Sequence, residues 1–150
     1  MNILFLCTGN SCRSQMAEAW AKKYWQNSSY QFYSAGIEAH GLNPHAVEVM
    51  QELGVDMSGH QSNTINEFSD MVFDVVITVC SNADETCPVL ELGTRKIHVG
   101  FDDPPKLALK ARNTKEALDC YRQVRDQIRE FIESLDTVLQ TDKPHSYSLR

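Results

Sequence analysis

Cys7 and Arg13 stand six residues apart, and the residues between them are mostly small or polar. Residues 4–15 read LFLCTGNSCRSQ, so a short apolar run ends at Cys7 and a helical pattern begins near Arg13. The N–H groups of such a loop, together with the N-terminus of the next helix, can surround a tetrahedral oxyanion. Arg13 offers a planar fork for two oxygens of that anion, and the same positive groups favour the thiolate form of Cys7. The spacing therefore predicts a cysteine nucleophile in an oxyanion-binding loop.

The other loop residues have types that suit this chemistry. Glycine and asparagine, as at positions 9 and 10, tolerate the left-handed backbone geometry of a tight curl. Ser14 can donate a hydrogen bond to the thiolate. Cys12 either packs beneath the loop or forms an off-pathway disulfide with Cys7 under oxidation. The candidate oxyanion-binding residues are Thr8, Gly9, Asn10, Ser11, Cys12 and Arg13.

A second cysteine pair, Cys80 and Cys87, lies in the stretch VCSNADETCP. A zinc site would need two further ligands, and the five histidines show no paired ligand spacing. A redox role fits better, because Cys80 ends a predicted strand and should face the same crevice as Cys7. If residues 80–87 were helical they would span ~10.5 Å, whereas a disulfide needs Cα atoms about 4.4–6.8 Å apart. A Cys80–Cys87 disulfide therefore requires a loop or an unwinding of this segment.

Composition limits the class of protein. The 150 residues fit one domain, and 42% hydrophobic with 23% charged residues is typical of a globular protein. The net charge of −6 argues against nucleic acid or an anionic membrane as the main partner. No apolar run is long enough to cross a bilayer, and the N-terminal residues lack the basic region of a signal peptide. We expect a cytoplasmic, monomeric protein whose five cysteines form no structural disulfide framework, with Cys120 structural.

The elements that must position these side chains alternate along the chain. Continuous apolar runs predict strands at 2–6, 31–37, 73–80 and 95–100. Helical spacing predicts helices at 12–25 with Ser11 as N-cap, at 44–53 with Asn43 as cap, and at 113–139. This order predicts an α/β fold, a four-stranded parallel sheet with helices on both faces, in one domain over 1–140 with a polar tail at 141–150. Ligands of such sheets bind beyond the carboxyl ends of the strands, so Cys7, Cys80 and the segment after His98 should meet there.

Several motifs carry a family resemblance. CTGNSCRSQMAE resembles the signature loop of the low-molecular-weight protein tyrosine phosphatase superfamily. YSAGIEAHGLNP, VITVCSNADETCP and GFDDP resemble, in this order, its thioredoxin-coupled arsenate reductase branch, over about residues 2–135. The resemblance implies that Asp103, directly before a proline, protonates the leaving group; without it, Asp102 and Asp103 could equally cap a turn. Pro105 and Lys106 replace the tyrosine that follows in the phosphatases, which counts against aryl phosphoesters.

The resemblance also implies a mechanism and its partners. Cys7, Cys80 and Cys87 would form a relay that reduces arsenate to arsenite through a transient Cys7–Cys80 disulfide and then a Cys80–Cys87 disulfide. Thioredoxin would supply the electrons, with no tightly bound cofactor. Positions Asn10, Glu18 and Ser34 match a potassium site of some relatives, although Asn63 replaces its aspartate. Two alternatives stay open: a phosphatase that uses Cys7, Arg13 and Asp103, and a non-enzymatic arsenic- or redox-sensing module.

Overall fold

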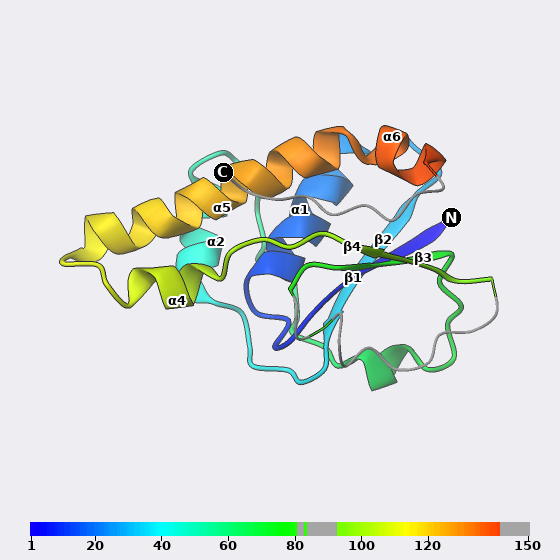
Figure 1. Ribbon diagram of the computed structural model, residues 1–150, viewed down its shortest axis with the longest axis horizontal. Coiled ribbons are helices and arrows are strands. Elements are labelled where there is room, and N and C mark those ends of the chain that lie inside the picture. The colour runs from blue at the N-terminus through cyan, green and yellow to red at the C-terminus, as the bar shows by residue number, and fades with distance from the viewer. Residues whose placement is uncertain (81–82, 84–92, 142–150) are drawn as a thin grey trace.

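The computed structural model describes residues 1–80, 83 and 93–141 (Figure 1). Strands and helices alternate along the chain, with a 3₁₀ helix, η1, before the third strand. Their bounds are β1 Asn2–Cys7, α1 Arg13–Tyr24, β2 Gln31–Gly36, α2 Pro44–Gln51, η1 Ile65–Phe68, β3 Val75–Thr78, β4 Arg95–His98, α4 Pro104–Ala108, α5 Thr114–Glu133 and α6 Leu135–Gln140. None of the helices in these described residues is both long and apolar enough to cross a membrane.

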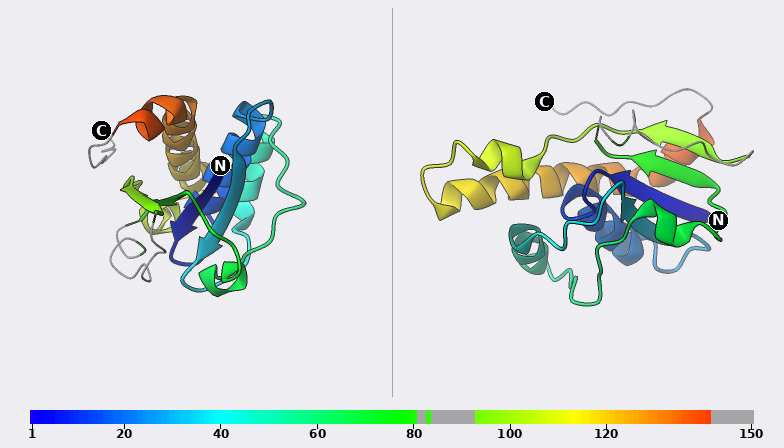
Figure 2. Two further views of the ribbon diagram at one scale, coloured as in Figure 1. Left: turned by 90° about the vertical axis from the view of Figure 1, so that its right-hand side faces the viewer. Right: turned by 90° about the horizontal axis from the view of Figure 1, so that it is seen from below.

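The four strands form one parallel sheet in the order β2-β1-β3-β4. The first strand is central: Leu6 pairs with Ala35 on one side and with Thr78 on the other. All four strands point the same way, so the loops that follow them gather at one end of the sheet (Figures 1 and 2). The predicted four-stranded parallel sheet with helices is confirmed. Cys7 and Cys80, which end or follow adjacent strands, are thereby brought to the same end.

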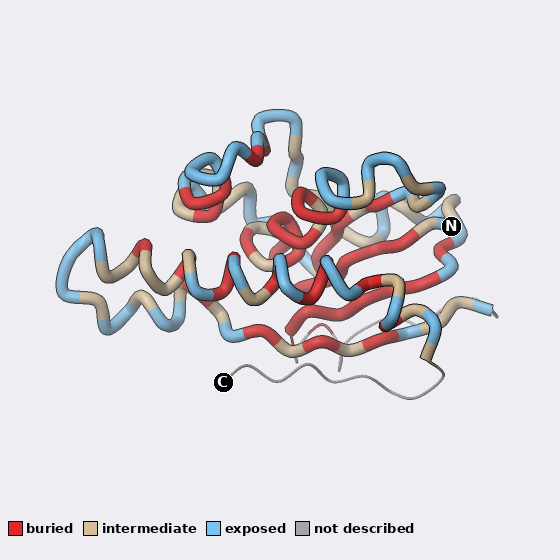
Figure 3. The backbone as a smooth tube through the Cα atoms, turned by 90° about the horizontal axis from the view of Figure 1, so that it is seen from above, coloured by how far each residue is buried: buried red, intermediate tan, exposed pale blue. Residues whose placement is uncertain are grey.

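Apolar side chains cover both faces of this sheet. On one face α1 and α5 pack together, and the Trp25 indole N–H after α1 donates to the Ile132 carbonyl of α5 at 2.9 Å. On the other face the rings of Tyr33, Phe68 and Phe73 pack edge to face and attach η1 to β2. Figure 3 shows the inner strands β1 and β3 as nearly continuous buried stretches, whereas the outer strand β4 and helix α5 alternate between buried and more exposed residues.

Three local predictions were wrong. The helix predicted over 113–139 is interrupted at Ser134, whose hydroxyl and N–H both donate to the Phe131 carbonyl, at 2.8 and 3.0 Å. These short-range bonds replace the helical pattern and separate α5 from α6. Ser11 does not cap α1: Cys12 holds the N-cap position and makes no side-chain capping bond. The strands predicted at 73–80 and 95–100 are shorter, ending at Thr78 and His98.

Asn43 caps α2 as predicted. Its side-chain oxygen accepts hydrogen bonds from the amides of His45 and Ala46 at 2.9 and 3.2 Å, and Pro44 occupies the first turn. Helix α4 was not predicted, because its stretch PPKLA has only five residues and no apolar stripe. The predicted tail at 141–150 lies almost entirely outside the described residues, so the domain boundary stays a prediction.

Candidate active site

The loop between β1 and α1, residues 7–13, forms a cradle because its carbonyl groups are turned outward. Successive carbonyl oxygens accept hydrogen bonds from amides of residues 37–43, which run alongside the loop. With the carbonyls held outside, the loop's N–H groups are free to face inward. The pairs, carbonyl first, are Cys7 with Ile37 (3.1 Å), Thr8 with Glu38 (2.8 Å), Gly9 with His40 (2.8 Å) and Ser11 with Asn43 (2.9 Å).

The inner side of this cradle loop is a hollow of about 290 Å³. Within the described part of the chain, the amides of Gly9, Ser11, Cys12 and Arg13 donate to no other protein group. These amides and the Arg13 guanidinium are therefore available to an anion. The lining residues are Cys7, Thr8, Gly9, Ser11, Cys12, Arg13, His40, Asp103 and Pro105.

Asn10 orients the hydrogen bond that reaches the Cys7 sulfur. Its backbone has φ +47°, the left-handed geometry expected of a glycine or asparagine here. Its side-chain oxygen accepts from the Asn63 amide at 2.7 Å, so its side-chain nitrogen is the group that donates to Ser14 Oγ at 2.8 Å. Ser14 Oγ therefore uses its own proton toward Cys7 Sγ, 2.8 Å away. The Asn10 amide donates to the same sulfur at 3.2 Å.

The orientation of Asn10 is in turn fixed by Gln15 and His60. Gln15 Nε2 donates to Asn10 Oδ1 at 2.9 Å, which leaves Gln15 Oε1 to accept from His60 Nδ1 at 2.8 Å. Burial lowers the pKa of His60, against the opposite effect of the nearby Glu18 carboxylate, so the neutral imidazole with its proton on Nδ1 fits this site. Four donors thus point in sequence from His60 to the Cys7 sulfur. Neither Gln15 nor His60 was identified from sequence, and no local pattern links His60 to a loop 45 or more residues earlier.

Arg13 and Asp103 also line the hollow. Arg13 Nη1 donates to the Phe101 carbonyl at 2.9 Å, and its Nη2 is 3.8 Å from Asp103 Oδ1. Asp103 stands at the N-cap position of α4 but makes no side-chain capping bond, and its side chain is 41% exposed. Its carboxyl group is therefore available to a ligand in the hollow. This geometry does not support the alternative that Asp103 serves as a turn cap.

The Cys80 thiol is buried beside the cradle loop. The Thr8 hydroxyl lies 3.3 Å from Cys80 Sγ, and the Ala83 amide donates to the same sulfur at 3.4 Å. This contact follows from the sheet, since Leu6 and Thr78 pair one residue before Cys7 and two residues before Cys80. Cys87 lies outside the described residues, so its part in a relay stays a prediction.

The two remaining cysteines differ in their surroundings. Burial raises the pKa of the Cys12 thiol, and the lowering effect of Arg13 does not offset it. A protonated, buried Cys12 fits the prediction that it packs beneath the loop better than the alternative of a disulfide with Cys7. Cys120 is half-buried on α5, and its thiol donates to the Glu116 carbonyl at 3.4 Å.

The residues at the matched potassium site do not fit a cation. The Glu18 carboxylate is already neutralised by Lys22 Nζ at 2.5 Å and accepts from the Ser34 hydroxyl at its other oxygen. Asn10 Oδ1 is occupied by two donors, and the Asn63 side chain turns to the Gln61 carbonyl at 3.0 Å. Among the described residues, no group of three or more His, Cys, Asp or Glu side chains is placed to hold a metal ion.

Comparison with known proteins agrees with this geometry. The family model for low molecular weight phosphotyrosine protein phosphatase matches residues 2–145. "Arsenate reductase 2" of Staphylococcus epidermidis is 47% identical over 135 residues, 90% of this chain and 95% of that protein. "Arsenate reductase" of Bacillus subtilis is 48% identical, over 88% and 95% of the two chains.

Solved structures give the same assignment. An arsenate reductase in the phosphate-binding state superposes with a TM-score of 0.69 at 30% identity, over 93% of this chain and 98% of that one. The cradle loop, the paired strands behind it and the similarity over nearly the whole chain lead to one conclusion: the chain belongs to the low molecular weight phosphotyrosine protein phosphatase family and groups there with the proteins named arsenate reductase.

Proposed function

We propose that this protein reduces arsenate to arsenite and is regenerated by a dithiol protein of the thioredoxin type. The observation that carries the proposal is the second buried thiol, Cys80, beside the loop that holds the Cys7 nucleophile. A phosphatase needs only the first thiol. The names of the relatives support the same activity.

The first step forms a bond between sulfur and arsenic. The Cys7 thiolate attacks arsenic, while the free loop amides and Arg13 hold the arsenate oxygens. One As–O bond breaks, and its oxygen leaves as water after receiving a proton from Asp103. Arsenic stays pentavalent, and the product is a Cys7 thioester of arsenate. The Ser14 hydroxyl and the Asn10 amide stabilise the thiolate before attack.

The second step moves two electrons to arsenic. The Cys80 thiolate attacks the Cys7 sulfur, a disulfide forms, and the electron pair of the S–As bond stays on arsenic, which leaves as arsenite. Two thiols are oxidised to one disulfide while As(V) becomes As(III), so electrons balance. Cys87 then attacks Cys80 and releases Cys7 as a thiolate. Thioredoxin reduces the Cys80–Cys87 disulfide by thiol exchange.

Several further features follow from this proposal. Repeated reduction of a disulfide requires a reducing compartment, so we propose a cytoplasmic location. We also propose that the protein acts as a monomer, since the described residues already surround the hollow within one chain. Arsenate and thioredoxin are the proposed partners, with no tightly bound cofactor.

The test measures NADPH oxidation by thioredoxin reductase and thioredoxin in the presence of arsenate. Wild type should turn over repeatedly. Cys87→Ser should release one arsenite per protein molecule and stop as a Cys7–Cys80 disulfide, which peptide mapping detects. Cys80→Ser should form no such disulfide. Cys120→Ser, a change of the same type on α5, should behave as wild type.

The alternatives give different results. A phosphatase would hydrolyse a small aryl phosphate with Cys7 and Asp103, be indifferent to Cys80→Ser, and oxidise no NADPH with arsenate. A sensing module would bind arsenic through its thiols without turnover and without dependence on Asp103. Repeated turnover by Cys87→Ser would contradict the relay even if arsenate is reduced.

A further inference from the structure

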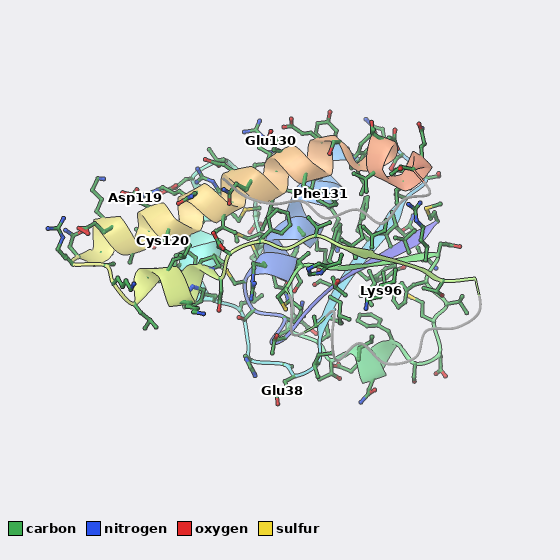
Figure 4. The ribbon with its side chains drawn as sticks, viewed as in Figure 1. Glu38, Lys96, Asp119, Cys120, Glu130 and Phe131 are labelled. Carbon is green, nitrogen blue, oxygen red and sulfur yellow. The ribbon has the colours of Figure 1, made fainter. Side chains whose placement is uncertain are left out.

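Two side chains outside the cradle loop form a pair that we name the rim pair: His40, which lines the hollow, and Glu38, which holds the His40 ring from outside it. They follow β2 on the segment whose amides hold the cradle carbonyls. Because residues two apart on an extended segment point the same way, their side chains meet, with His40 Nε2 and Glu38 Oε2 2.6 Å apart. Figure 4 shows Glu38 projecting from this segment at the outside of the molecule, well away from Cys120 on α5.

The His40 ring rests directly on the cradle loop. A Cβ atom on Gly9 would lie 2.3 Å from His40 Nδ1, so only glycine at position 9 leaves room for the ring. The ring also lines the hollow that contains Cys7, as does Asp103. The hollow that leads to the Cys7 sulfur is therefore lined by both an imidazole and a carboxyl group.

Glu38 determines which ring nitrogen of His40 carries the proton. A carboxylate only accepts hydrogen bonds, so His40 Nε2 must carry a proton. In the neutral imidazole, Nδ1, the nitrogen against Gly9, is then an acceptor.

Hydrogen arsenate carries one O–H group, whereas a phosphate monoester carries a bulky organic group at that position and no proton.

We propose that His40, held by Glu38, is a specificity-determining residue that restricts the hollow to inorganic hydrogen-oxyanions. Its ring narrows the mouth against an organic substituent, and its Nδ1 accepts the proton of the substrate's hydroxyl group. The inference rests on the proposed function, because it names the substrate class of the same hollow. Both groups of the rim pair are more than half exposed, so their role is recognition rather than stability.

The test measures binding without turnover, as protection of Cys7 from alkylation by iodoacetamide. The two probes are inorganic phosphate and phenylphosphonate, at a pH where phenylphosphonate is a dianion without a proton. Wild type should be protected by phosphate at much lower concentration than by phenylphosphonate. His40→Ala should reduce this preference for phosphate by about tenfold or more. The variant loses one hydrogen bond to phosphate, and it no longer has the ring that excludes the phenyl group.

Two further variants separate the two parts of the role. His40→Leu keeps the bulk and removes the acceptor, so phosphate protection should weaken while phenylphosphonate stays excluded. Glu38→Gln should weaken phosphate protection less than His40→Ala. His45→Ala is the matched control: its imidazole also pairs with a carboxylate, that of Glu48, but packs against the Tyr121 ring and does not line the hollow.

An unchanged preference in His40→Ala would overturn the proposal, as would an equal effect of His45→Ala. Because protection needs no electron donor and no turnover, this result is independent of the coupled assay. If the protein prefers phosphate as described but does not reduce arsenate, the role of the rim pair stands and the proposed function is wrong. If it reduces arsenate and His40→Ala leaves the binding preference unchanged, the proposed function stands and the role of the rim pair is wrong.

Discussion

The reactivity of Cys7 depends on the direction of each hydrogen bond that leads to it. Ser14 can give its proton to the sulfur only because Asn10 donates to the Ser14 oxygen, and Asn10 is held in that orientation by Gln15. If the Asn10 side chain presented its oxygen to Ser14 in place of its nitrogen, the Ser14 proton would be drawn away from the sulfur and the Cys7 thiolate would lose this hydrogen bond. The chemistry of this one atom therefore depends on side-chain amides that never touch the substrate.

Ser14→Ala should slow alkylation of Cys7 by iodoacetamide at pH 7 by at least about tenfold. The change removes a hydrogen bond to a charged group, which typically contributes about 1.5–3 kcal/mol. Ser58→Ala is the control, because its hydroxyl donates to the Asp56 carboxylate at the surface, away from the hollow. Equal alkylation rates for wild type and Ser14→Ala would show that the hydroxyl does not support the thiolate.

Asp103→Asn should slow arsenite release in a single turnover by about 10²–10⁴-fold, the usual cost of losing a general acid. Phosphate protection of Cys7 should change little, because the variant keeps the cradle amides and Arg13. Asp102→Asn is the neighbouring control. If the single-turnover rate of Asp103→Asn matched wild type, another group would have to supply the proton.

At the scale of elements, the cradle is shaped by a segment that is distant in sequence from its own residues. The stretch between β2 and α2 holds the cradle carbonyls, and Asn43 connects that stretch to two helices. Its backbone amide donates to Ser11, its side-chain oxygen caps α2, and its side-chain nitrogen donates to the Tyr121 hydroxyl of α5 at 3.1 Å. One side chain thus links the cradle, α2 and α5.

Asn43→Ala should therefore affect both stability and binding. Loss of the cap should reduce the free energy of unfolding in urea by about 1 kcal/mol. Phosphate protection of Cys7 should also weaken, because the segment that holds Ser11 loses its anchor to Tyr121. Asn113→Ala provides the comparison: it removes the equivalent cap of α5, where Asn113 accepts from Glu116, and lies outside the hollow. A matched loss of stability in both variants, with normal phosphate protection in each, would contradict the linking role.

The sequence predicted those parts of the site that are contiguous. Cys7 to Ser14 form one loop with a recognisable residue pattern, and the strand before it is a plain apolar run. The contacts to His60 and His40 were not predicted, because they depend on how separate loops pass over one another. Helix α4 and η1 were also missed, since each has too few residues to show a hydrophobic period.

At the scale of the whole molecule, a cluster of charges fastens α2 to α5. The Glu52 carboxylate accepts from Arg122 Nη2 at 2.6 Å and from Arg125 Nη1 at 2.8 Å, and Arg125 also donates to the Val49 carbonyl. Arg125 is buried, whereas Glu52 is partly exposed. Hydrogen bonding from Arg122, joined by Arg125 and opposed by burial, holds the pKa of Glu52 below its ordinary value.

The contribution of Glu52 to stability should depend on pH. Because its pKa is lower in the folded than in the unfolded protein, its stabilising effect is complete above the unfolded value of about 4.3 and is lost as pH falls through the folded value. Glu52→Gln should lower stability by about 1 kcal/mol at pH 7. When melting temperature is measured from pH 7 to pH 3, the values for wild type and Glu52→Gln should converge at acid pH. A constant difference between the two melting temperatures across that range would exclude this linkage.

The central position of β1 in the sheet has a consequence during synthesis. The first 43 residues contain the cradle loop and every amide that holds its carbonyls, whereas the neighbour on the other side of β1 is made only when residues 75–78 emerge. At the usual speed of translation the interval is on the order of seconds. During that time a growing chain contains Cys7 but has no Cys80 beside it, and because a domain generally folds as a unit, the cradle is completed only when β3 pairs with β1. The nucleophile therefore acquires its anion-binding loop and its neighbouring second thiol in the same folding event, so the reactive site does not exist without the thiol that completes the reaction.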